Sequence, residues 1–120
     1  VKVNGNLNGP YQSGLIIYLK RGIKLMLCLD KGYKISLFCP EKGDNYTLYS
    51  DDFTESSAYF RIVKESSVLK FYWKKHENDP WKMKYEMENC SDVSSCGLFT
   101  KTFEKVNFSA EFSHVSYITY

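Results

Sequence analysis

Hydrophobic and polar residues alternate with a period of two along most of this chain. A β-strand turns successive side chains to opposite faces, so this period is typical of strands with one buried face. The clearest case is Trp81–Glu88, where Trp81, Met83, Tyr85 and Met87 alternate with four charged residues. No helical period is sustained anywhere. The pattern predicts an all-β protein.

Short turns separate the alternating segments and divide the chain into about nine strands. The predicted strands are Ile23–Leu29, Tyr33–Cys39, Tyr46–Tyr49, Tyr59–Val63, Val68–Lys74, Trp81–Glu88, Leu98–Phe103, Val106–Ser113 and Val115–Tyr120. Regular short strands at this spacing favour a single antiparallel sandwich or barrel. We expect residues 1–14, with their Asn-Gly and Ser-Gly pairs, to form an irregular arm before one all-β domain over residues 15–120.

The same alternation assigns the larger aromatic side chains to faces. Trp73 and Trp81 fall on the apolar side of their strands, and we expect both to anchor the core. Tyr49 and Tyr72 fall on the opposite side. Because exposed tyrosines are enriched at protein interfaces, Tyr49 and Tyr72 are candidate partner-binding residues.

Basic residues are dense at Lys74, Lys75, Lys82 and Lys84, and a solvated strand face is one reading of this cluster. We take them as further partner-binding candidates. An extracellular protein is the expected partner, and a sulfated glycan is the alternative because clustered cations attract polyanions.

Composition excludes several other classes. The 120 residues suit one domain, and 43% hydrophobic with 17% aromatic residues is too apolar for a disordered chain. A net charge of +2, with basic and acidic residues intermixed, argues against a nucleic-acid partner. No apolar run approaches the ~18 residues of a membrane span, so we expect no membrane insertion.

Four cysteines, an even number in a short chain, predict a disulfide framework. They are Cys28, Cys39, Cys90 and Cys96, and their spacing contains no metal-binding pair. All three pairings stay open, and free buried thiols at Cys28 and Cys39 are the alternative.

Three N-x-[ST] triplets, at Asn45, Asn89 and Asn107, are candidate glycosylation sites in predicted turns or on polar strand faces. The chain opens with Val1 rather than methionine, so we expect a mature or excised fragment without its targeting segment. Together with the cysteines, these features predict a secreted or extracellular glycoprotein.

Candidate catalytic chemistry is sparse. His76 and His114 would serve a small secreted hydrolase as an acid–base pair, because histidine transfers protons near neutral pH. Nothing in their spacing brings them together, and no glycine-rich phosphate loop or metal-ligand pattern occurs. We therefore expect no enzyme activity, no cofactor and no metal.

Several segments resemble the interleukin-1 family of cytokines. They are Gly22–Leu29, Ile35–Cys39, Tyr46–Leu48, Ala58–Ile62, Leu69–Phe71 with Pro80-Trp81, and Val106–Phe112. The resemblance spans roughly residues 21–112 and implies a β-trefoil that binds an immunoglobulin-like receptor and has no catalytic residues. Only about twenty residues precede Arg21, fewer than the opening strands of a trefoil require, and that family seldom relies on disulfides.

The leading expectation is therefore a secreted, non-catalytic protein-binding module, β-trefoil-like and cytokine-like. The alternative is a disulfide-stapled, immunoglobulin-like β-sandwich that serves as the ectodomain of a cell-surface or host-interaction protein.

Overall fold

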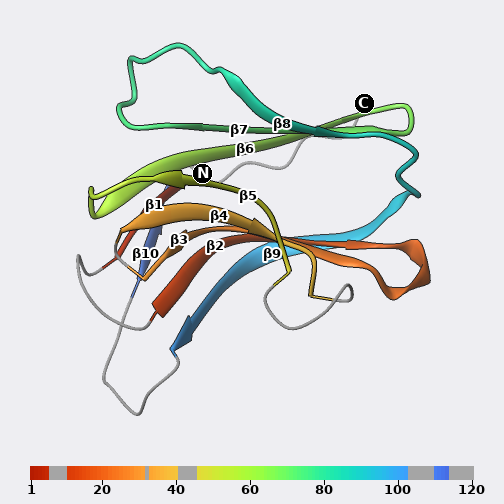
Figure 1. Cartoon of the computed structure of the whole chain (residues 1–120), viewed down its shortest axis with the longest axis horizontal. Coiled ribbons are helices and arrows are strands. Elements are labelled where there is room, and N and C mark those ends of the chain that lie inside the picture. Colours follow the sequence, from red (N-terminus) through yellow and green to blue (C-terminus); the bar gives the residue numbers. More distant parts are fainter. Residues whose placement is uncertain (6–10, 32, 41–45, 103–109, 114–120) are drawn as a thin grey trace.

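The computed structural model describes residues 1–5, 11–31, 33–40, 46–102 and 110–113. Their strands form two five-stranded antiparallel sheets that lie in two layers (Figure 1). The order is β10-β1-β6-β7-β8 in sheet A and β5-β4-β3-β2-β9 in sheet B. The prediction of a single antiparallel all-β domain is confirmed.

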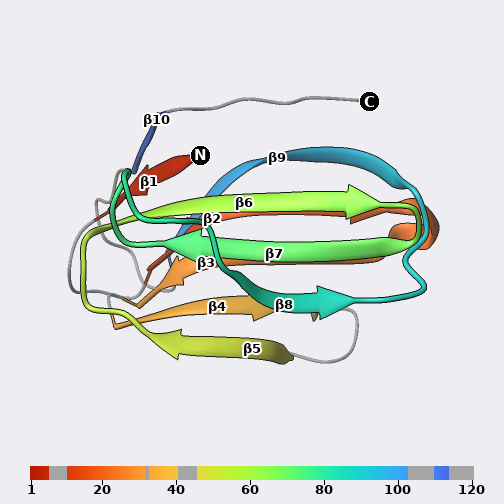
Figure 2. The ribbon, with the colours of Figure 1, turned by 90° about the horizontal axis from the view of Figure 1, so that it is seen from above.

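The strand bounds show which parts of the chain build each layer. Sheet A contains β1 (Lys2–Asn4), β6 (Ser57–Glu65), β7 (Val68–Lys74), β8 (Met83–Met87) and β10 (Glu111–Ser113). Sheet B contains β2 (Tyr11–Leu19), β3 (Lys24–Asp30), β4 (Lys34–Phe38), β5 (Thr47–Asp52) and β9 (Val93–Thr102). Seen from above, β8 lies over the side of sheet B formed by β4 and β5 (Figure 2).

The core lies between the two layers. Alternation in β3 and β4 turns one set of aliphatic side chains toward sheet A, namely Leu25, Leu27, Leu29, Ile35 and Leu37. Sheet A contributes Phe60, Leu69, Phe71 and Trp73 to the same buried cluster. Burying one apolar face on each strand explains why a period of two runs through the sequence.

The start of the chain corrects one expectation. The described residues among the first fourteen do not form an irregular arm, because Lys2–Asn4 is a strand of sheet A and Tyr11 begins a nine-residue strand of sheet B. Val3 and Tyr11 are both buried in the core cluster. The glycine and asparagine content suggested a loop, but pairing with the neighbouring strands outweighs these weak local preferences.

Other boundaries differ less. The predicted strand Val68–Lys74 is confirmed with both of its end residues. Strand β5 continues to Asp52, three residues beyond the predicted end at Tyr49. Strand β9 starts at Val93, five residues before the predicted Leu98. The predicted strand Val115–Tyr120 lies outside the described residues.

An irregularity between β7 and β8 decides where Trp81 lies. Phe71 is opposite Tyr85, but the next residue, Tyr72, is opposite Met83, so β8 has one extra residue there. Such a bulge reverses the face to which the preceding side chains point. Trp73 is in the core as predicted. Trp81 contacts Tyr72 on the outer face of sheet A, so its predicted core position is wrong.

The β2–β3 connection is a single 3-10 turn, Lys20–Gly22. Among the described residues, no helix has the length and hydrophobicity needed to cross a membrane.

Candidate functional site

The outer face of sheet A carries basic and aromatic side chains in adjacent cross-strand rows. Tyr59 on β6 lies opposite Lys2 on one side and Lys74 on the other. Two residues further along β6, Arg61 lies opposite Tyr72 on β7. Paired residues of antiparallel strands point to the same face, so all five side chains share one surface.

Trp81 completes this surface from the segment between the turn at residues 75–80 and β8. The Lys74 Nζ atom lies 4.4 Å from the centre of the Trp81 ring, and the Arg61 Cζ atom lies 5.8 Å from it. The Tyr72 ring meets Trp81 edge-on, with ring centres 6.5 Å apart. These distances fit cation–π contacts and a T-shaped aromatic pair, which hold the indole in place.

Tyr59 extends the arrangement toward the first strand. The Nζ atoms of Lys2 and Lys74 each lie 5.6 Å from the centre of the Tyr59 ring. We call the group Lys2, Tyr59, Arg61, Tyr72, Lys74 and Trp81 the Trp81 surface.

Backbone contacts fix the central cation of the Trp81 surface. Lys74 Nζ donates hydrogen bonds to the carbonyl oxygens of Glu77 at 2.6 Å and Asp79 at 3.0 Å. The turn itself is closed because the His76 amide donates to Asp79 Oδ2 at 3.0 Å. Lys74 therefore loses little further conformational freedom when a ligand binds, which lowers the entropic cost of recognition.

The positive charge of the Trp81 surface is not neutralised by carboxylates within the described chain. The ion pairs found among the described residues are formed by other lysines, namely Lys20, Lys34, Lys64, Lys70 and Lys75. Lys2, Arg61 and Lys74 contact aromatic rings instead. An anionic group arriving from outside would therefore meet cations that need not first give up a carboxylate partner.

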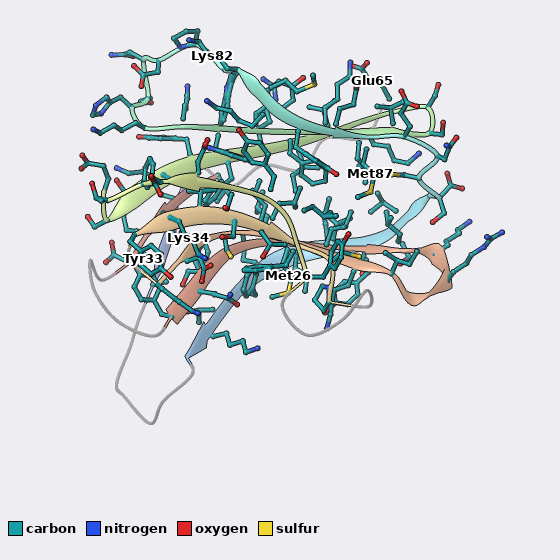
Figure 3. All side chains as sticks on the ribbon, in the orientation of Figure 1. Met26, Tyr33, Lys34, Glu65, Lys82 and Met87 are labelled. Carbon is teal, nitrogen blue, oxygen red and sulfur yellow. The ribbon has the colours of Figure 1, made fainter. Side chains whose placement is uncertain are left out.

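The partner-binding residues predicted from sequence do not all lie on one surface. Tyr72 and Lys74 belong to the Trp81 surface, with Lys82 exposed near it on the same outer side (Figure 3). Lys84 is half-buried on β8. Tyr49 faces inward, with its ring centre 5.4 Å from that of Trp73, because it lies in register with the core residue Leu37.

Lys75 is held by a different contact. Its Nζ atom lies 2.9 Å from Glu55 Oε1, and this hydrogen-bonded pair lowers the pKa of the Glu55 carboxyl. Both side chains are about half exposed, so the pair contributes little to stability. The charge of Lys75 is therefore neutralised by Glu55, and Lys75 is not part of the Trp81 surface.

The predicted disulfide framework is not present, since all four cysteines are free thiols. Cys28 lies in register with Ser36 and Gly14, on the face of sheet B that points away from sheet A. Cys39 belongs to the core cluster and Cys90 packs against it. Sheet B therefore separates Cys28 from these two, while Cys96 is exposed on β9.

The candidate glycosylation and catalytic residues are only partly described. Asn89 is exposed, with a φ of 58°, in the turn after β8, a position that a glycan can occupy. Asn45, Asn107 and His114 lie outside the described residues. His76 is exposed in the turn that follows Lys74. No group of metal-binding side chains occurs in the part of the chain that the structure describes.

Sequence reasoning missed Lys2, Tyr59, Arg61 and Trp81. Alternation along β6 could have identified two of them, because it places Tyr59 and Arg61 on the face of the strand that points away from the core, whereas Phe60 points into it. Lys2 lies within residues 1–14, which were expected to form an irregular arm and not a strand. No local pattern marks the bulge that turns Trp81 outward.

Comparisons with known protein families, curated proteins and solved structures found no match to this chain. The resemblance to the interleukin-1 family stays a prediction.

Proposed function

We propose that this chain is a non-catalytic binding module that engages an acidic protein partner through the Trp81 surface. The observation that carries the proposal is the environment of Trp81. A tryptophan lies outside the core, with Lys74 at 4.4 Å and Arg61 at 5.8 Å from its ring centre. Tryptophan, tyrosine and arginine are the residues most enriched at the energetic centres of protein interfaces.

The chemistry of the surface supports an acidic partner. Arg61 is exposed, and a guanidinium presents donors in a fork that matches a carboxylate. The partly exposed Tyr72 and Trp81 rings supply apolar area that is already ordered, whereas Tyr59 is only 9% exposed and supports the lysines from below. The cations supply charge complementarity. Such a surface gives affinity through a few central side chains and faster association through its charge.

An extracellular location is part of the proposal. Its support is the exposed turn position of Asn89 in the triplet Asn89-Cys90-Ser91, which leaves the acceptor open to glycosylation.

Selection from a random displayed peptide library against the intact chain tests the proposal. We expect the selected peptides to be enriched in Asp and Glu, and we expect Trp81→Ala or Arg61→Glu to weaken their binding at least tenfold. Two matched controls lie away from the surface. Tyr33→Ala removes a half-exposed aromatic ring beside sheet B, and Arg21→Glu makes the same charge reversal in the β2–β3 turn.

Two results would overturn the proposal. One is peptide binding that survives Trp81→Ala and Arg61→Glu as well as it survives the controls. The other is a heparin oligosaccharide that binds through the Trp81 surface while no acidic peptide does, which would assign the surface to a sulfated glycan.

A further inference from the structure

Among the described strands the two sheets have four edges, and three of these edges carry features that oppose pairing with another strand. β10 has only three residues, and β8 has five, of which Lys84 and Glu86 are charged. β5 ends in Asp51 and Asp52, and Asp51 points inward, where it accepts a hydrogen bond from Trp73. Short edge strands, charges and inward-pointing carboxylates are the usual means by which proteins prevent edge-to-edge association.

The fourth edge strand, β9, lacks this protection. It is ten residues long, lies on the opposite side of the molecule from β5 and β8, and pairs only with β2 among the described strands (Figure 2). Lys101 is its single charged residue, and it contains no proline. A register shift against β2 is confined to its start, between Val93 and Ser95, and regular pairing continues to Thr102. β9 therefore offers a long, regular edge to another strand.

The side chains of β9 are apolar on both faces of the sheet. Leu98 lies opposite Leu15, which packs against the core cluster, yet Leu98 is 40% exposed. Phe99 lies on the other face, opposite Gly14, and is only half-buried. A long edge strand with exposed apolar side chains and little charge is the feature through which sheets associate edge to edge.

A second copy of β9 fits this edge when it runs antiparallel about a two-fold axis. Opposed residues of an antiparallel pair point to the same face, so under this symmetry one residue must face its own copy across the axis. With Leu98 at that position, the two exposed leucines cover each other on the face that points to the core. The axis then lies within the regular part of β9, beyond the register shift.

The other face of β9 favours the same register. An axis at Leu98 places each Phe99 opposite Gly97 of the other copy, where an aromatic ring can cover the glycine backbone. A Cβ atom at Gly97 would have its nearest neighbour, Ile16 Cγ2, at 3.9 Å, so the ring has room. An axis at Gly97 would oppose two glycines, and an axis at Phe99 would oppose each Leu98 to Thr100. Only the axis at Leu98 matches apolar residues with each other and covers the glycine.

From this geometry we propose that two copies of this chain associate through β9, antiparallel about a two-fold axis at Leu98, so that their two copies of sheet B become one continuous sheet. The register sets Lys101 opposite the neutral Ser95 and brings no like charges face to face. Because the pairing uses the open edge of both copies, assembly stops at a dimer. The Trp81 surface, on the outer face of sheet A, takes no part in this contact.

Sedimentation velocity of the intact chain measures the association, with a reducing agent present so that the exposed Cys96 forms no interchain disulfide. We expect a reversible monomer–dimer equilibrium between about 1 µM and about 1 mM, because pairing along one edge buries less area than a permanent interface. Leu98→Lys sets two lysines against each other at the axis and should weaken the dimer at least tenfold. Met83→Lys is the matched control at an exposed apolar residue of β8, and it should dimerise as the wild type does.

Mixing two variants makes the test specific for the axis. Leu98→Lys and Leu98→Glu should each associate weakly alone, and their equimolar mixture should recover a dimer, because an axis at this residue brings the opposite charges together. If these variants do not fold, Ser95→Glu and Ser95→Lys form the second pair at an exposed position that faces Lys101 across the interface. Ser95→Glu should strengthen the dimer, and Ser95→Lys should weaken it.

Four results would overturn the proposal. A wild-type chain that stays monomeric up to about 1 mM would show that the β9 edge does not pair with itself. Equal dimerisation of Leu98→Lys and the wild type would place the contact elsewhere. A mixture of the Leu98→Lys and Leu98→Glu variants that stays monomeric would exclude the axis at this residue. Assembly beyond a dimer would show that the contact does not close about a two-fold axis.

Discussion

The Ser36 hydroxyl donates a 3.0 Å hydrogen bond to Oδ2 of Asp30, and this carboxylate is only 1% exposed. Gln12 Nε2 donates to the other oxygen, Oδ1, at 3.1 Å, and Lys34 Nζ lies 3.8 Å from Oδ2. Three neighbouring strands of sheet B, β2, β3 and β4, are thus joined by side chains as well as by backbone hydrogen bonds. A buried carboxylate is tolerated here because donors and a cation surround it.

Asp30→Ala should lower the free energy of unfolding by about 2–4 kcal/mol, because Gln12 and Ser36 would keep buried donors without their acceptor. Urea unfolding followed by tryptophan fluorescence measures the change. Asp52→Ala is the matched control, since Asp52 is exposed and lies opposite the same Lys34. It should cost no more than about 0.5 kcal/mol. Equal costs for the two variants would contradict this account of Asp30.

Two glycines on adjacent strands should respond oppositely to alanine. A Cβ atom at Gly14 would lie 2.0 Å from the Leu27 carbonyl oxygen and 2.6 Å from the Cys28 Cα atom, so the backbone of β3 would have to move. We expect Gly14→Ala to cost at least about 2 kcal/mol. A Cβ at Gly97 has its nearest neighbour, Ile16 Cγ2, at 3.9 Å. Gly97→Ala should be neutral or slightly stabilising in the same urea unfolding measurement. A tolerated Gly14→Ala variant would contradict the close β2–β3 approach.

The two tryptophans should differ in their effect on stability. Trp73 is 4% exposed and donates from Nε1 to Asp51 Oδ2 at 3.2 Å, which links the two sheets. Trp73→Ala should cost about 3–5 kcal/mol, as expected for a large core residue. Trp81→Ala should cost only about 1 kcal/mol, because it removes surface cation–π contacts. Thermal unfolding of both variants checks this, and a reversed order would show that the bulge does not turn Trp81 outward.

Alkaline pH should destabilise the protein partly through Cys28. Burial, followed by the nearby Asp30 carboxylate, raises the pKa of this thiol well above its ordinary value. Above pH about 9 the unfolded chain therefore loses the thiol proton first, and the free energy of unfolding falls by at most about 1.4 kcal/mol per pH unit from this group. Unfolding between pH 8 and 10 should be less pH-dependent in Cys28→Ala than in the wild type. Cys96→Ala, at an exposed thiol, is the control and should follow the wild type.

The sequence predicted the fold class well because alternation reports directly on one-sided burial. Val68–Lys74 is found in full, and its core residues Leu69, Phe71 and Trp73 are those that alternation selects. Trp81 was misplaced because one extra residue in β8 reverses the alternation, and a bulge depends on pairing with β7 rather than on local sequence.

Other features depend on contacts between distant segments, which no local pattern contains. The buried Asp30 carboxylate, for example, accepts a hydrogen bond from Gln12, 18 residues away in the sequence. Cys28 cannot pair with Cys39 because the two fall on opposite faces of sheet B, and no local pattern shows on which face a cysteine lies. The candidate site was therefore only partly predictable, through Tyr72 and Lys74, since Lys2 joins it from a strand at the other end of the chain.

The most direct test of the central proposal is the affinity of a selected acidic peptide for the Arg61→Glu and Arg21→Glu variants, measured by isothermal titration calorimetry at low and high salt. If the Trp81 surface binds the partner, Arg61→Glu weakens binding at least tenfold, Arg21→Glu leaves it within about twofold of the wild type, and salt weakens wild-type binding. Equal affinities for the two variants, or loss of binding only in Arg21→Glu, would contradict the proposed binding surface.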